Sequence, residues 1–269
     1  MNKGGFSYDG HRLISCDALS ETGLVRHGFS TRKDGTSSGN FSSLNLGIHI
    51  SDKQENVRQN FILFCRDVGV EPKQTVFARQ VHSTLVLPVT KQDAGKGIVL
   101  PGNLPEADGV VTNEPGVCLT TFYADCTPIL LLDPVCSVIA AVHSGWRGTI
   151  GKIICEAICL MQKQYGSESR NIIAATGPSI KQCHFEVDED VYLQFVETFG
   201  EIAQKSTVSK GQKYYIDTDS LHAHLLLSMG VLAQNIHTCK SCTYCDDSLF
   251  FSHRREGITG RMAAMIELK

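Results

Sequence analysis

One short segment joins metal-binding and anion-binding side chains to a tight turn. Val138–Val142 is an apolar run typical of a buried strand, and His143 follows it directly. The glycine-bracketed turn Ser144–Gly148 comes next and holds the only tryptophan of the chain beside an arginine. An apolar-periodic stretch then predicts a helix over Thr149–Tyr165. A strand, a glycine-rich turn and a helix are typical of ligand sites in open α/β folds, because a helix N-terminus offers free N–H groups.

Two further side chains of the metal-binding type precede this segment. His82 ends the motif Gln80-Val81-His82, and Cys126 ends Ala124-Asp125-Cys126, just before an apolar strand. One cysteine and two histidines at element ends suit a tetrahedral zinc ion with a fourth position open to water or substrate. His82, Cys126 and His143 are therefore candidates to bind zinc and act in catalysis. Because these residues lie far apart in the sequence, structural polar groups with internal hydrogen bonds remain the alternative.

The same residues allow other chemistries. Cys126 as nucleophile and His143 as base would make a thiol hydrolase without metal. One cysteine and two histidines also resemble part of a blue-copper site, as in a copper-dependent polyphenol oxidase. A multicopper oxidase needs clustered histidines, however, and the ten of this chain are scattered. A non-enzymatic protein would instead hold a structural zinc on four protein ligands.

A second cysteine pattern lies near the C-terminus. Cys239, Cys242 and Cys245 are each three residues apart, a spacing found in metal sites. No fourth ligand is adjacent, although His237 and His253 are candidates. Free thiols are the preferred interpretation here, and a second metal site is the alternative.

Positive charge gathers at a few turns of this acidic chain. Arg147 lies in the glycine-rich turn, and Arg254 and Arg255 stand between the aromatic pair Phe250-Phe251 and Gly257. A planar guanidinium group binds phosphate or carboxylate through two parallel hydrogen bonds. The pattern therefore predicts an anion site at Arg147 or at the Arg254–Arg255 pair.

Composition excludes several classes of protein. The chain has 269 residues, a net charge of −3, 42% hydrophobic and 20% charged residues, as in a soluble globular protein. It carries no basic footprint for nucleic acid, and no apolar run reaches the roughly 18 residues of a membrane span. No signal segment opens the chain, so we expect a cytoplasmic protein whose eleven cysteines are reduced.

Strand and helix patterns alternate along the chain without a repeat or a linker, which predicts a single layered α/β domain over residues 1–269. A helix should begin near Ser51 or Asp52 and run to Val68. The other elements are predicted from apolar periodicity. They are strands at Gly109–Thr112, Val117–Phe122, Pro128–Asp133, Val135–Val142, Asn171–Thr176, Tyr214–Asp217, Leu249–His253 and Met262–Leu268, and helices at Glu189–Phe199 and Ser220–Met229.

The ordered motifs of the chain resemble a known family nearly end to end. They are Phe29-Ser30-Thr31-Arg32, Ser43-Leu44-Asn45-Leu46-Gly47, Gln80-Val81-His82, Ala107-Asp108-Gly109, Ala124-Asp125-Cys126, His143–Gly148, Gly177–Ile180, Cys183–Val187, Phe250–Arg255 and Thr259–Met262. With these motifs the chain resembles the YfiH/YlmD family, formerly called laccase-domain proteins or multicopper polyphenol oxidases and now regarded as purine nucleoside phosphorylases. Three positions depart from the common pattern: Ser144 for alanine, Ser179 for cysteine and His253 for tyrosine.

This resemblance implies a fold, an activity and a site. The fold is a layered α/β domain with mixed sheets between helices, and the metal ligands are His82, Cys126 and His143. The implied reaction is the zinc-dependent cleavage of adenosine, inosine, guanosine and S-methyl-5'-thioadenosine by phosphate, with adenosine deaminase activity beside it and copper binding in vitro as an option. The family motifs also place Arg32 and Asn45 near the substrate.

Two carboxylates are candidates for acid–base work at such a metal. Asp125 and Glu186 belong to the family motifs, and a carboxylate beside a metal can transfer protons. The alternative is that each is a hydrogen-bond acceptor in a turn or at a helix cap.

Overall fold

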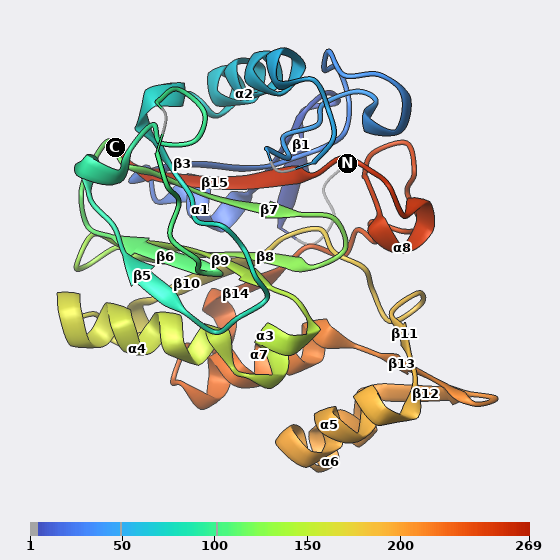
Figure 1. Ribbon diagram of the computed structural model, residues 1–269. Coiled ribbons are helices and arrows are strands. Elements are labelled where there is room, and N and C mark those ends of the chain that lie inside the picture. The colour runs from blue at the N-terminus through green and yellow to red at the C-terminus, as the bar shows by residue number, and fades with distance from the viewer. Residues whose placement is uncertain (1–4, 49, 101) are drawn as a thin grey trace.

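Two six-stranded sheets lie face to face between helices in the computed structural model, which describes residues 5–48, 50–100 and 102–269 (Figure 1). One long helix covers the outer face of the first sheet, and further helices cover the outer face of the second. The order of layers is therefore helix, sheet, sheet, helix.

The first sheet carries both the earliest and the last strand of the described chain. Its pairs are antiparallel except for the last, in which β4 runs parallel to β7. The strand order is β1 (Phe6–Tyr8), β2 (Leu13–Cys16), β3 (Val25–Ser30), β15 (Met262–Leu268), β7 (Cys118–Tyr123) and β4 (Thr75–Val76).

The second sheet is mixed and holds the strands next to the metal-binding residues. Each of its two edge strands runs parallel to the strand beside it, and the central strands pair antiparallel. The strand order is β14 (Ile236–Thr238), β10 (Ile173–Thr176), β8 (Thr127–Asp133), β9 (Val138–Ser144), β6 (Gly109–Thr112) and β5 (Val86–Pro88).

A third, three-stranded sheet lies at one corner of the molecule with two of the helices (Figure 1). Its order is β11 (Glu186–Val187), β13 (Lys213–Ile216) and β12 (Thr207–Lys210). The α-helices are α1 (Asp17–Glu21), α2 (Gln54–Val68), α3 (Trp146–Ile150), α4 (Ile153–Tyr165), α5 (Glu189–Phe199), α6 (Glu201–Lys205), α7 (Thr218–Ser228) and α8 (His253–Glu256). Short 3-10 turns lie at Gly39–Phe41, Pro72–Gln74, Lys91–Asp93, Ser169–Asn171 and Ala233–Asn235.

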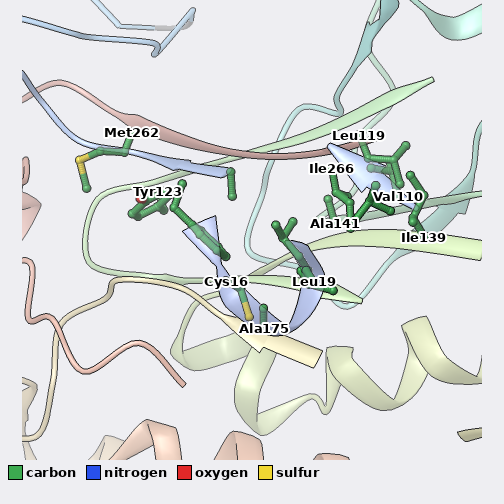
Figure 2. Packing of buried hydrophobic residues seen from close by; sticks show 14 of the residues in the cluster. Cys16, Leu19, Val110, Leu119, Tyr123, Ile139, Ala141, Ala175, Met262 and Ile266 are labelled. Carbon is green, nitrogen blue, oxygen red and sulfur yellow. The ribbon is translucent and has the colours of Figure 1, made fainter. Parts of the chain in front are cut away.

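The alternation of side chains along the central strands builds this layering. In β9, Ile139 and Ala141 point into the core between the two sheets, whereas Val138, Ala140 and Val142 pack toward α4. Successive residues of a strand face opposite sides, so a strand covered on both faces is apolar throughout. Figure 2 shows Ile139 and Ala141 among residues of the facing sheet, including Leu119 and Ile266.

The predicted fold class, a layered α/β arrangement with mixed sheets between helices, is confirmed. Most predicted elements occur within a few residues of their expected bounds. The helix expected from Ser51 or Asp52 begins at Gln54, and its N-cap is Lys53. Among the described residues, no helix combines the length and apolar character needed to cross a bilayer.

Two predicted elements need correction. The helix predicted over Thr149–Tyr165 is two helices, α3 and α4, and the first already begins at Trp146. The helix is interrupted at Gly151 and Lys152. A Cβ atom at Gly151 would lie 2.3 Å from Cγ2 of Thr84, and Lys152 has a φ of 60°. The glycine-rich turn predicted to bind an anion is therefore itself part of a short helix.

The strand predicted at Leu249–His253 is wrong, because this segment is a turn into α8. The backbone N–H of Phe250 donates to the carbonyl of Asp246, and Ser252 caps α8 by accepting a hydrogen bond from the N–H of Arg255. The two phenylalanines are fully buried in the core between the sheets, although they lie in the turn and not in a strand.

Candidate functional site

His82, Cys126 and His143 come together where the two central strands of the second sheet end. Their ligand atoms all lie within 4.8 Å of one another. Cys126 directly precedes β8 and His143 lies in β9, where it pairs with Pro128, so the antiparallel register brings the two residues together. His82 reaches them from the loop between β4 and β5, and its Nε2 lies 3.9 Å from the Cys126 sulfur. We call these three residues the trio.

Asp108 holds both histidines of the trio in place. Its carboxylate accepts hydrogen bonds from Nδ1 of His143 at 2.9 Å and from the backbone N–H of His82 at 3.0 Å. It also accepts from the backbone and the hydroxyl of Ser83. With Nδ1 bound to a carboxylate, the other ring nitrogen of His143 is free to act as a ligand, which is the usual arrangement around metal-binding histidines.

Gly145 closes the trio from one side. A Cβ atom at this position would lie 2.9 Å from Cδ2 of His82 and 3.2 Å from the Cys126 sulfur. Only glycine leaves the two ligands room at this turn. One thiolate and two imidazoles are donors that suit zinc and copper, and three donors leave a coordination position free. The residues present therefore fit a metal ion with an open position.

The charges within the trio support a thiolate next to an imidazolium. Burial disfavours the ionised thiol, but His143 and His82 beside it lower the pKa of Cys126 to about 6. Burial likewise disfavours the imidazolium, yet Cys126 and Asp108 raise the pKa of His143 to about 9. A thiolate is the form of cysteine that binds a metal or attacks a substrate.

The trio lies between two cavities of similar size. The first has a volume of about 340 Å³, and its lining includes Arg147 and Arg254 together with Trp146 and Phe185. The second has a volume of about 350 Å³ and is bounded by another set of side chains, including Ile48, Ile50, Phe122, Tyr123 and Arg261. We call them the arginine lobe and the apolar lobe.

His82, Cys126 and His253 line both lobes. His253 is the first residue of α8, and its Nδ1 lies 2.8 Å from the carbonyl of Gly257. The position at which the family commonly has tyrosine is therefore at the junction of the two lobes. A change of side chain there alters both.

Two of the predicted arginines reach the arginine lobe. Arg147 is exposed and stacks on the Trp146 ring, with its guanidinium carbon 4.2 Å from the ring centroid. Arg254 is also exposed, and its Nη1 donates to the backbone carbonyl of Glu186 at 2.8 Å. Both guanidinium groups keep donors for an anion in the lobe.

Arg255 lies outside both lobes, in contrast to the prediction for the Arg254–Arg255 pair. Its guanidinium donates to the backbone carbonyls of Thr243, Tyr244 and Phe250. The donors that would bind an anion thus hold the turn before α8. Arg255 therefore supports the site indirectly, by stabilising the turn that precedes α8.

Arg32 and Asn45 are likewise not brought to either lobe. Arg32 forms an ion pair with Glu256 at 2.7 Å and lies over the Phe251 ring. Asn45 is fully buried, donates to Asp52 and accepts from the backbone N–H groups of Gly47 and Arg261. Asn45 is therefore a structural residue that sets the position of two residues of the apolar lobe.

The two carboxylates predicted for acid–base work are engaged in structural hydrogen bonds. One oxygen of Asp125 accepts from the Thr243 hydroxyl and the other from the backbone N–H of Arg254, both at 2.7 Å. Glu186 accepts from the Tyr215 hydroxyl and does not line the arginine lobe. Asp125 thus lines the arginine lobe while it accepts hydrogen bonds from two neighbouring segments, and Glu186 accepts across the β11–β13 pair.

Sequence reasoning missed Asp108 and His222 as supports of the site. Burial lowers the pKa of His222 to about 3, so this histidine is neutral. Its Nε2 lies 3.1 Å from the Ser144 hydroxyl and 2.9 Å from that of Thr149, on either side of Gly145. Asp108 has two signals in the sequence, its place in the motif Ala107-Asp108-Gly109 and its position directly before a strand. His222 lies in an apolar helix and has none.

Only two of the three C-terminal cysteines considered as an alternative metal site lie together in the structure. Cys239 is buried in the core between the sheets, whereas Cys242 and Cys245 lie together with Cys183 and His184. His237 lies in β14 and His253 at the junction of the lobes, so neither proposed fourth ligand joins them.

Comparison with known proteins gives consistent similarities over most of the chain. A family described as "Multi-copper polyphenol oxidoreductase laccase" matches residues 26–269. Purine nucleoside phosphorylase YlmD of Bacillus subtilis is 35% identical over 246 residues, covering 90% of this chain and 88% of that protein. A purine nucleoside phosphorylase of Bacteroides thetaiotaomicron is 32% identical over 263 residues, covering 95% and 96%.

Solved structures show the same similarity in three dimensions. A Bacillus licheniformis protein described as hypothetical protein YfiH superimposes with a TM-score of 0.93 at 31% identity, covering 99% of this chain and 100% of the other. YlmD of Geobacillus stearothermophilus gives the same four values.

Proposed function

This chain belongs to the multi-copper polyphenol oxidoreductase laccase family, and from that premise we propose that it is a metal-dependent purine nucleoside phosphorylase. The observation that carries the proposal is the position of the trio between an arginine lobe and an apolar lobe. Relatives about one-third identical carry the name purine nucleoside phosphorylase, which supports it. A single domain over residues 1–269 is part of this proposal, and the core shared by both sheets supports it.

In this proposal the arginine lobe binds phosphate. Arg147 and Arg254 each offer guanidinium donors, and charge-assisted hydrogen bonds to phosphate are the stronger kind. The apolar lobe takes the nucleoside, with the purine against Ile48, Ile50 and Phe122. The ribose then lies next to the trio, between the two binding regions.

Phosphorolysis exchanges one bond for another at C1′ of the ribose. A phosphate oxygen forms the new bond to C1′ while the bond from C1′ to N9 of the purine breaks. The electron pair leaves with the purine, which takes up a proton from solvent or from dihydrogen phosphate, and ribose 1-phosphate remains. Arg147 and Arg254 contribute by fixing the attacking oxygen close to C1′.

The proposed metal is zinc, held by His82, Cys126 and His143, with copper as an alternative occupant in vitro. When bound, such an ion polarises a substrate oxygen or a water molecule. Asp108 fixes the ring of His143, and Gly145 leaves space for the ligands. The proposed substrates are adenosine, inosine, guanosine and S-methyl-5'-thioadenosine, and adenosine deamination is the proposed second activity.

The test is cleavage of inosine by the purified protein with and without phosphate, with products identified by mass spectrometry. The proposal predicts hypoxanthine and ribose 1-phosphate, at a rate that rises with phosphate concentration until the site is saturated. Free ribose at a rate independent of phosphate would show a hydrolase and overturn it.

A thiol hydrolase is the second candidate, because the pKa of Cys126 is about 6 and its thiolate can also be a nucleophile. Metal removal separates the two. A chelator abolishes a zinc-dependent reaction and leaves a Cys126–His143 dyad active. Activity that survives complete zinc removal would favour the hydrolase.

A further inference from the structure

A second cluster of metal-binding side chains lies outside the two lobes. Cys183, His184, Cys242 and Cys245 place their ligand atoms within 4.8 Å of one another. Cys183 and His184 lie in the loop between β10 and β11, and Cys242 and Cys245 in the segment between β14 and α8. We call these four residues the quartet. We propose that the quartet is a second, structural zinc site, separate from the trio.

The spacing of the donor atoms matches a tetrahedral ion. Zinc–sulfur bonds of about 2.3 Å place two sulfur ligands about 3.8 Å apart on the edge of a tetrahedron. The sulfur of Cys183 lies 3.7 Å from that of Cys242 and 3.6 Å from that of Cys245. Nδ1 of His184 lies 3.2 Å from the Cys183 sulfur and 3.3 Å from the Cys245 sulfur. Three thiols and one imidazole thus already surround a common centre.

The donor set is complete, in contrast to that of the trio. Three cysteines and one histidine are a common combination in closed structural zinc sites. Cys242 and Cys245 are separated by two residues, which is the usual spacing of a zinc-binding pair. When zinc binds, the three thiols release their protons to solvent and the metal takes four protein bonds.

Neighbouring groups orient the ligands of the quartet. The ring of His184 stacks on Tyr244, with centroids 4.0 Å apart and an interplanar angle of 16°. The backbone N–H of Lys181 donates to the Cys242 sulfur at 3.4 Å. Such contacts around the ligands hold their geometry in metal sites.

The quartet joins one segment that lines the arginine lobe to a second segment that hydrogen-bonds to Asp125, a residue of the lobe wall. The first segment carries Ile180 and Phe185, which line that lobe. The second carries Thr243, whose N–H donates to the Ser179 carbonyl and whose hydroxyl donates to Asp125. A metal at the quartet therefore ties the loop before β11 to the turn before α8.

The test is the zinc content of the reduced protein, expressed with zinc in the medium and purified with a non-thiol reductant. Wild type should contain about two zinc ions per chain, and Cys126→Ala and Cys245→Ser about one each. Cys239→Ala is the matched control, because Cys239 belongs to the same sequence run but lies in the core; it should keep both ions.

Cobalt substitution of Cys126→Ala protein supplies a second measurement that does not require altering the quartet. The cobalt-substituted protein should show the strong sulfur-to-cobalt absorption and the visible bands of a tetrahedral site with three thiolates. Zinc content in Cys245→Ser equal to wild type, or no thiolate–cobalt absorption in Cys126→Ala, would overturn the proposal. So would a disulfide between Cys183 and Cys242 or Cys245 that persists in the presence of the reductant.

Discussion

The trio and the quartet use the same kinds of donor atom in opposite settings. The trio offers three ligands, and its histidines and cysteine lie between two cavities. The quartet offers four ligands and joins two loops. Because zinc takes four ligands, the number of protein donors decides whether a position remains for substrate. If both proposals hold, the two sites of one chain separate catalysis from structural support.

This contrast also explains how each site is buttressed. The trio is held by a buried carboxylate, that of Asp108, and by the absence of a side chain at Gly145. The quartet is held by a stacked tyrosine and a backbone N–H group. Changes to the groups that support the trio should therefore alter the rate of the reaction, whereas changes to the groups that support the quartet should lower the stability of the fold.

The largest expected effect is that of Cys126→Ala. The variant should lose the metal of the trio and on the order of a thousand-fold in the rate of nucleoside cleavage, since a catalytic metal supplies several kcal/mol. The melting temperature should fall only by the stabilisation that the trio metal itself provides, because no quartet ligand is changed. Steady-state kinetics and calorimetry on the same preparation measure both. Cleavage at the wild-type rate would show that the trio is not the reaction centre.

Cys245→Ser should have the reverse effect. At zinc concentrations a thousand times the dissociation constant, binding at the quartet stabilises the fold by about 4 kcal/mol, and the variant loses that contribution. Denaturant unfolding with and without a chelator measures the difference. A chelator that destabilises wild type and Cys245→Ser equally would contradict a structural role.

Asp108→Asn should weaken metal binding at the trio alone. An amide cannot accept from Ser83, His82 and His143 as the carboxylate does, and loss of such a supporting group costs about 10- to 100-fold in metal affinity. Competition with a chromophoric chelator should show one weakened site and one unchanged site. Equal affinity at both would mean that Asp108 serves only the backbone.

The smallest effect distinguishes the two adjacent arginines of α8. Arg254→Ala should raise the phosphate concentration for half-maximal rate by about tenfold, because a charge-assisted contact contributes roughly 1.5–3 kcal/mol. Arg255→Ala should lower the melting temperature, because three carbonyls lose their donor. Phosphate titrations and melting curves of both variants provide the comparison. The opposite pattern would exchange the roles of the two residues.

The sequence predicts the trio because Cys126 and His143 lie next to apolar runs and His82 ends the motif Gln80-Val81-His82. The antiparallel pairing of β8 and β9 is enough to bring Cys126 and His143 together. The fold class follows in the same way from strands that are apolar throughout.

Side-chain direction within short turns is what the sequence could not supply. Arg254 and Arg255 are neighbours in a four-residue helix, and the helical turn sends one guanidinium to the lobe and the other to the backbone. The quartet joins Cys183 to Cys242, which is 59 residues away, through loops with no periodic pattern. Only the folded chain shows that these loops meet.

The most direct test of two distinct metal centres is a crystal of the wild-type protein measured above and below the zinc absorption edge. We predict two anomalous peaks per chain that vanish below the zinc edge. One should contact His82, Cys126 and His143 and keep a non-protein ligand in the cleft, and the other should contact the four quartet side chains alone. A single peak, or a trio ion with four protein ligands, would contradict the account.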